Sequence, residues 1–252
     1  MNSKTIWAIV IVVLVILGIY LIVKTPGMNN NSGLDENKNE ESSAKGRVVF
    51  SVTDAAANMS TISEITVKIS RVDIHSDVDG WSAVSITPKS YDLLALDASG
   101  ESKILADIQT KAEVYDQIRL VIDSVSVKTK AGATKEATVP GNQFVLDTIL
   151  VVDGSSTSSV NLDFLADKSL HTTSSGQYVF APVVKTETKS KVTANIDASG
   201  TVILIGGKTD ESSTAGMDLS GTVRANFELD TNQKIELDTD NMIKIDGNAL
   251  LK

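Results

Sequence analysis

Residues 115–122 read YDQIRLVI, and the spacing of their apolar side chains decides the kind of fold. Ile118, Leu120 and Ile122 fall at every second position, which is the pattern of a strand with one buried face. On a regular strand Tyr115 and Arg119 share one face, while Ile118 and Leu120 share the other. The stretch therefore predicts a long, half-buried β-strand.

The same alternation recurs beyond Gly46. It is present at residues 48–50, 65–69, 118–122 and 144–150. Around Ser70-Arg71 the phase shifts, which indicates a bulge or a bend in the strand. Turn signals such as Asp79-Gly80 separate the runs, and only residues 103–110 suggest a short helical turn. Many short strands joined by polar turns predict an all-β fold, either a sandwich or a barrel.

Composition limits the partners and the chemistry. The chain has 252 residues and a net charge of −9, from 32 acidic and 23 basic residues. An acidic surface is repelled by phosphate backbones, so we expect no nucleic-acid partner. There is no cysteine, which excludes disulfides, thiolate metal sites, cysteine nucleophiles and a lipoprotein anchor. His75 and His171 are the two sources of imidazole.

The amino terminus carries a membrane signal. Residues 6–23 are an uninterrupted apolar run between Lys4 and Lys24, and as a helix they span about 27 Å, close to the hydrocarbon core of a bilayer. The run is longer than the apolar part of a signal peptide, and no A-x-A-like cleavage site follows. We predict an uncleaved transmembrane anchor over residues 1–24, with cleavage after Gly27 as the alternative. The flanking charges favour a cytoplasmic amino terminus at the cell membrane, with the bulk of the chain extracytoplasmic.

The anchor is followed by a polar segment and then by the predicted β-domain. Residues 25–45 contain almost no apolar side chains, so we expect a flexible stalk. The β-domain is expected over residues 46–187. Residues 185–191 read KTETKSK, a charged sequence that we interpret as a link. Residues 188–252 then form either a small C-terminal β-module or an extension of the first sheet.

Several blocks of the first module resemble one family. They are GRVVFSVTDA at 46–55, VDIH at 72–75 ahead of Trp81, YDLL at 91–94, YDQIRL at 115–120, LDF at 162–164 with DKS at 167–169, and Tyr178 with PVV at 182–184. In this order they resemble the family called domain of unknown function 4382, over about residues 46–185. Glu113 departs from the pattern, because a Gly is expected ahead of Tyr115. The resemblance implies a β-sandwich of immunoglobulin or transthyretin style in a bacterial or archaeal exported protein, and it supplies no catalytic residues.

The residues of these blocks are interpreted as structural. They are Asp92, Tyr115, Arg119, Asp163, Phe164, Tyr178 and Pro182. Arg119 is expected to pair with Asp92 or Asp163, in a buried ion pair that fixes strand register, in preference to holding a ligand. Trp81 is expected to pack in the core or at an edge, and the alternative is a stacking platform for a sugar.

No catalytic motif is present. The chain lacks G-x-S-x-G, H-E-x-x-H, a phosphate-binding glycine loop and a dinucleotide fingerprint. We therefore predict a protein that is not an enzyme and needs no cofactor. The alternative is a carbohydrate-active enzyme that uses a pair of carboxylates, as glycosidases do. Calcium is the one ion considered, with candidates at Asp73, Asp77 and Asp79 and further aspartates at 230, 238, 240 and 246. Solvated turns are the favoured interpretation of these aspartates.

Two functions of different classes follow from these features. The first is a cell-surface binding or adhesion module with a protein or glycan partner, held at the membrane by its anchor. The second is a structural subunit of a surface layer or filament, whose edge strands pair with neighbouring subunits.

Overall fold

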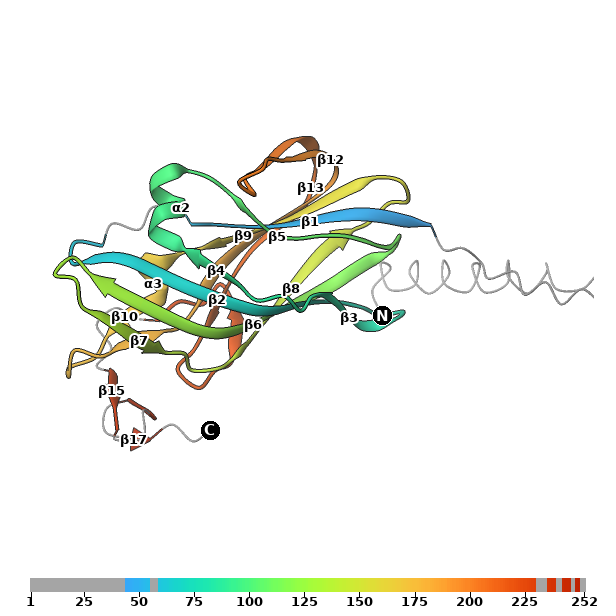
Figure 1. Ribbon diagram of the computed structural model, residues 1–252. Helices are drawn as coiled ribbons and strands as arrows, with labels where there is room; N and C mark the ends of the chain where they lie inside the picture. Colours follow the sequence, from blue (N-terminus) through green and yellow to red (C-terminus); the bar gives the residue numbers. More distant parts are fainter. Residues whose placement is uncertain (1–43, 55–58, 230–234, 239–241, 246–247, 250–252) are drawn as a thin grey trace, which may run out of the picture. The chain divides into compact units, whose positions relative to one another are not determined.

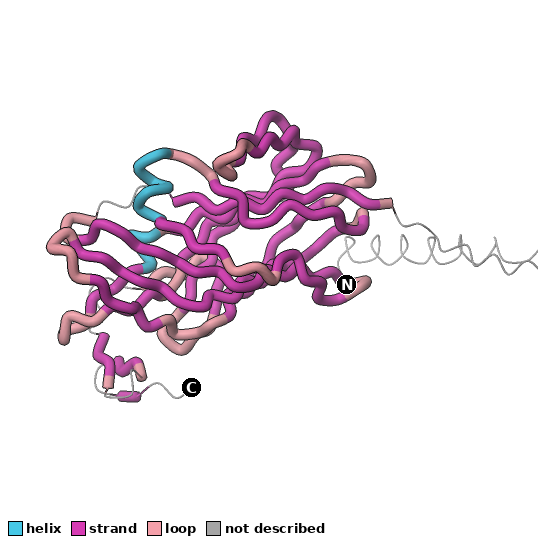
Figure 2. Tube along the Cα trace, viewed as in Figure 1, coloured by secondary structure: helices cyan, strands magenta, loops and turns pink. Residues whose placement is uncertain are grey.

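The computed structural model describes residues 44–54, 59–229, 235–238, 242–245 and 248–249. Strands dominate this part of the chain, as the colouring by secondary structure makes plain (Figure 2). The predicted anchor and most of the predicted stalk lie outside the described residues. Within the described part, none of the helices has the length and apolar character needed to cross a membrane.

The strands form two large sheets (Figure 1). The 6-stranded sheet has the order β14 (Val223–Ala225), β13 (Val202–Met217), β12 (Val183–Ile196), β9 (Thr157–Phe164), β1 (Lys45–Asp54), β5 (Lys103–Lys111). The 8-stranded sheet has the order β10 (Leu170–Thr172), β11 (Tyr178–Phe180), β7 (Thr134–Thr138), β6 (Val114–Thr129), β2 (Ile62–Ser76), β3 (Gly80–Ser85), with β4 (Lys89–Asp92) on β2 and β8 (Gln143–Val151) on β6. A third sheet of β15 (Ile235–Leu237), β16 (Ile243–Ile245) and β17 (Asn248–Ala249) is much smaller.

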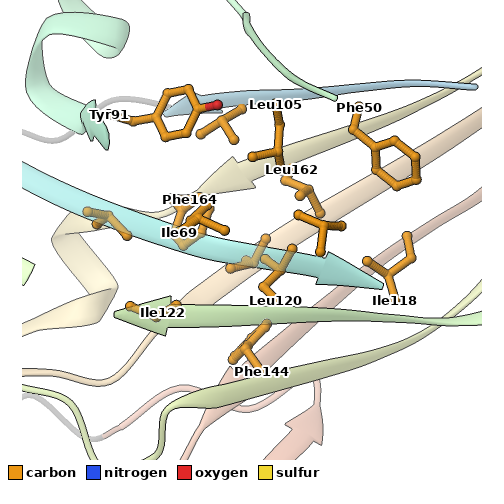
Figure 3. Close-up of a cluster of buried hydrophobic side chains, with 14 of the residues drawn as sticks. Phe50, Ile69, Tyr91, Leu105, Ile118, Leu120, Ile122, Phe144, Leu162 and Phe164 are labelled. Carbon is orange, nitrogen blue, oxygen red and sulfur yellow. The ribbon is translucent and has the colours of Figure 1, made fainter. Parts of the chain in front are cut away.

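One hydrophobic core joins the two large sheets (Figure 3). The 6-stranded sheet contributes Phe50, Leu162 and Phe164, and the 8-stranded sheet contributes Ile118, Leu120 and Phe144. All six side chains are fully buried. The all-β prediction is confirmed, and packed sheets of this kind are consistent with a β-sandwich.

Two irregularities decide which side chains face this core. The register of β2 with β6 shifts between Ile69 and Arg71, where the sequence predicted a bulge. The register of β6 with β8 shifts between Tyr115 and Gln117, and this second irregularity was not predicted. Tyr115 is therefore buried on the core side together with Ile118. The expectation that Tyr115 and Arg119 share a face is wrong, because a bulge between them reverses the alternation.

Two short segments differ from the sequence-based expectation. Residues 103–110 belong to strand β5 and form no helical turn. The helix lies just before it, in α2 (Leu93–Ser99), which buries Leu93 and Leu96 and ends at Gly100 in the left-handed conformation. The other described helix is the single turn α3 (Ala166–Ser169).

The charged stretch 185–191 is the middle of β12, where a link was expected. Thr186, Thr188 and Ser190 are buried, and the charged side chains between them are more exposed. The alternation was missed because its inward positions carry hydroxyl groups and no aliphatic side chains. Beyond this stretch the chain stays in the same sheet through β13.

Candidate functional site

The outward face of the 8-stranded sheet carries a cluster of polar and aromatic side chains. Arg71, Asp73 and His75 occupy alternate positions of β2, between the core residues of the opposite face. The strand register places Asp73 opposite Arg119 of β6 and His75 opposite Trp81 of β3. Cross-strand neighbours share a face, so these side chains meet. Together with Asp116 they are called the Trp81 face below.

Asp73 lies at the base of this face. Its side chain is 0% exposed, and its carboxylate accepts hydrogen bonds from Arg71 Nε at 2.7 Å and from Arg119 Nε at 2.9 Å. The Arg119 side chain is 21% exposed and Arg71 is more open. A fully buried carboxylate needs such partners, because its charge would otherwise be left without compensation. The three charges therefore hold β2 and β6 in register.

Trp81 lies over the arginine. The guanidinium carbon of Arg119 is 4.2 Å from the centre of the Trp81 ring, within the range of a cation–π contact. The ring of His75 is tilted against the same indole, with 5.1 Å between centroids. Trp81 nevertheless remains 38% exposed. Asp73, Arg119 and Trp81 thus form successive layers, with a partly exposed indole as the outermost one.

Two hydrogen-bonded pairs lie at His75 and at Gln117, the residue opposite it on β6. His75 Nδ1 lies 2.7 Å from Asp116 Oδ1, and Gln117 Nε2 donates to Asp147 Oδ1 at 2.8 Å. The charges of the two arginines balance those of Asp73 and Asp116. These four charged side chains of the Trp81 face therefore carry no formal net charge.

A comparison with known protein families shows the family of the chain. The family model described as "Domain of unknown function (DUF4382)" matches residues 45–182, more than half of the chain. The chain belongs to the DUF4382 family. No curated protein and no solved structure matches it. All of the Trp81 face lies within the DUF4382 region, whereas β12 to β17 follow it.

The partner predicted for Arg119 requires correction. Arg119 pairs with Asp73, whereas the sequence suggested Asp92 or Asp163. Asp92 ends β4 and accepts a hydrogen bond from the backbone N–H of Ile65. Asp163 lies on β9, in the other large sheet of the DUF4382 region. The prediction chose these two aspartates because each is adjacent to apolar residues in the sequence. The partner of Arg119 is instead determined by the register between strands, which the sequence of a single strand does not reveal.

The predicted aromatic residues lie inside the DUF4382 domain. Phe164 is fully buried, and Tyr115 and Tyr178 also lie in the main core. The Tyr115 hydroxyl hydrogen-bonds with Thr110 Oγ1 over 2.7 Å. Pro182 is buried between β11 and β12, and its carbonyl accepts a hydrogen bond from the N–H of Met217.

The calcium candidates of the first module do not converge. Asp73 is held by two arginines, Asp79 accepts a hydrogen bond from the Lys111 ammonium group, and Asp77 is exposed. In the last segment Asp238 accepts the N–H of Met242, while residues 230, 240 and 246 lie outside the described part. The described residues contain no group of three or more acidic or histidine side chains arranged for a metal ion.

One buried carboxyl of the DUF4382 domain was not singled out from the sequence. Asp54 ends β1 and is 4% exposed, and its Oδ1 accepts the N–H of Ala166 at 3.1 Å. Burial raises the pKa of Asp54 to about 7, and the negative charges of Asp163, Asp97 and Asp167 act in the same direction. The only signal in the sequence was its place in the T-D-A block at 53–55.

Proposed function

We propose that the chain is a membrane-anchored, extracytoplasmic binding module whose ligand is a cell-surface glycan. The anchor is the apolar run at residues 6–23, and the polar residues after it serve as the stalk. The binding domain is a β-sandwich of immunoglobulin or transthyretin style, and its ligand contacts the Trp81 face.

The partly exposed indole of Trp81, backed by Arg119, carries this proposal. An indole offers an apolar face on which the C–H face of a sugar ring stacks. The contacts with Arg119 and His75 fix the orientation of the ring before a ligand arrives, which lowers the entropy lost on binding. The open guanidinium of Arg71 and the paired carboxylate of Asp116 supply donors and acceptors for sugar hydroxyls.

The balance of charge favours a neutral glycan over a phosphorylated ligand. The charges of the two arginines are balanced by Asp73 and Asp116, so this face offers no excess positive charge to a phosphate. The chain as a whole is acidic, which also disfavours polyanions.

We propose binding without catalysis at this face. The Asp73 carboxylate accepts hydrogen bonds from two arginines and is fully buried, so it is poorly placed to exchange a proton with a substrate. Asp116 contacts His75 on the outer surface of the sheet. A sugar ring stacked on Trp81 at this surface would remain open to water.

The test uses the full-length protein in a mild detergent on a panel of immobilised neutral and acidic polysaccharides. Trp81→Ala should abolish retention on the polysaccharide that the wild type binds. Ile203→Ala, which removes a comparably exposed apolar side chain from β13, should leave retention unchanged. Equal retention of Trp81→Ala and wild type, with both folded, would contradict the proposal.

A second candidate, self-assembly through an edge strand, is favoured by β13. Among the described residues, this strand pairs with β12 along its length but with β14 only over residues 215–217. Ile203 and Ile205 are exposed on the part of β13 that has no outer partner strand in the described part of the chain. A subunit of a layer or filament would form large species in sedimentation velocity, and Ile205→Lys would disperse them. A monomer at all concentrations argues against assembly.

A further inference from the structure

Two lysines occupy inward positions at one side of the domain, where β4 faces β5. Lys89 of β4 stands opposite the core residue Ile69 of β2. Lys103 of β5 stands opposite the core residue Val52 of β1. Cross-strand neighbours point to the same face of a sheet, so both lysine side chains are directed towards the space between the two large sheets. Such positions usually carry apolar side chains, because burying an ammonium group is costly.

Lys89 has no counterion in the described part of the chain. Its Nζ donates a hydrogen bond to the carbonyl of Ile104 in β5 at 3.2 Å. The hydroxyl of Tyr91 donates to the same carbonyl at 2.9 Å and points towards Leu105 of β5 (Figure 3). Burial lowers the pKa of Lys89, because the charged form loses water there. An anion next to this ammonium group would offset the lost hydration.

The charge of Lys103 is compensated within the protein. Its Nζ lies 2.8 Å from Glu101 Oε2 and interacts electrostatically with Asp197, in the turn between β12 and β13. The same ammonium group donates to Thr201 Oγ1 at 2.7 Å and to Ser199 Oγ at 3.3 Å. These contacts hold the turn beside β5, and they leave the ammonium group of β4 as the cation that lacks a carboxylate partner among the described residues.

A cavity of about 340 Å³ lies between these groups. The N–H of Ile104 donates to the carbonyl of Gly200 at 2.8 Å, which fixes the β12–β13 turn as one of its walls. Pockets for small ligands begin at about 300 Å³, so this cavity has room for a small organic molecule. Its lining comes from β4, β5 and the turn, and consists of Lys89, Ser90, Tyr91, Lys103, Ile104, Ser199 and Gly200.

We propose that this cavity binds a small hydroxylated carboxylate, such as a uronic acid, through Lys89. An ammonium group has three N–H donors, and Ile104 accepts one of them, so two are left for the carboxylate. The hydroxyls of Tyr91 and Ser199 line the same cavity and can bond to hydroxyl groups of the ligand. One uncompensated cation matches a single negative charge, which favours a carboxylate over a phosphate dianion. The cavity shares no residue with the Trp81 face, and its ligand does not depend on the proposed glycan binding.

The experiment is isothermal titration of the full-length protein, in a mild detergent, with sodium D-glucuronate. We expect saturable binding and a melting temperature that rises with ligand concentration, because the ligand binds the folded state. D-Glucose, which has the same ring without the carboxylate, should not bind, and inorganic phosphate should bind more weakly than glucuronate. Lys89→Met should weaken glucuronate affinity at least about tenfold, because a hydrogen bond to a charged group is lost. Lys130→Met removes an exposed lysine from the turn after β6 and should keep wild-type affinity.

Four results would overturn the proposal. The first is the absence of both binding heat and a melting shift when glucuronate is added to the wild type. The second is glucose affinity equal to that of glucuronate, and the third is tighter binding of phosphate. The fourth is equal glucuronate affinity in Lys89→Met and wild type. If Lys89→Met does not fold, the comparison of the three ligands on the wild type still decides, because it requires no variant.

Discussion

Replacing Arg119 by Met tests whether the charges beneath Trp81 hold the sheet together. The substitution keeps a long apolar side chain but removes the guanidinium that contacts Asp73 and Trp81. Asp73 is fully buried, so its charge depends on the remaining arginine, Arg71. We expect Arg119→Met to lower the free energy of unfolding.

The magnitude follows from how far each partner is buried. Removing one partner of a buried ion pair costs about 3–5 kcal/mol when the other charge is left alone. Because Arg71 still contacts Asp73, we expect about 2–3 kcal/mol for Arg119→Met. Arg71 is half exposed, so Arg71→Met should cost only about 1 kcal/mol. The double variant leaves Asp73 without a cation, and its cost should exceed the sum of the single costs by about 1 kcal/mol or more.

Urea unfolding of the full-length protein, followed by circular dichroism, measures these differences. Arg47→Met is the control, because its ion pair with Asp107 is partly exposed and should contribute no more than about 1 kcal/mol. An unshifted urea midpoint for Arg119→Met, or strict additivity in the double variant, would refute the structural role. Arg119 would then be a residue kept for ligand contact alone.

Three further predictions concern the core, a buried acid and the attachment to membranes. Phe164→Ala should lower the free energy of unfolding by about 3–5 kcal/mol in urea, because it empties a fully buried position. Between pH 4 and 7 the folded state holds a proton on Asp54 that the unfolded state has released, so stability should fall as the pH rises through this window. One pKa unit corresponds to about 1.4 kcal/mol. Because relaxation of the structure and access of water reduce this effect, we expect Asp54→Asn to stabilise the protein by about 1–2 kcal/mol at pH 8. If the slope of stability against pH is unchanged in this variant, Asp54 is not the cause of the slope. In fractionated cells the protein should pellet with membranes and resist carbonate extraction, and recovery of a soluble form that begins at Met28 would contradict the anchor.

The all-β fold was predictable because most inward positions carry aliphatic residues at a spacing of two. The prediction failed where this signal was altered locally. The inward positions of β12 in this stretch have the spacing of two expected for a strand, at Thr186, Thr188 and Ser190. Because these residues carry hydroxyl groups within a charged sequence, no apolar alternation was visible and the strand was not predicted. At Tyr115 an unpredicted bulge reversed the alternation, so a correct assignment of the strand still gave the wrong face.

The candidate site was less predictable than the fold, because it depends on pairing between strands. The sequence singled out Arg119, Trp81 and Asp73, but assigned them to three separate roles. Register brings them together: Asp73 stands opposite Arg119, and the indole of Trp81 lies over the guanidinium. Nothing in a single strand specifies its neighbour's register to one residue, and a slip of one residue moves every side chain to the other face.

The fluorescence of Trp81 tests the proposed binding face most directly. The chain has two tryptophans, so the Trp7→Phe variant leaves the indole of Trp81 as the only reporter. Titration of this full-length variant with the polysaccharide that it binds should give a saturable blue shift of the emission, because a stacked sugar ring displaces water from the indole. The midpoint of the shift should equal the dissociation constant measured by calorimetry. Saturating binding without any change in Trp81 emission would contradict the account, because the ligand would then occupy another surface.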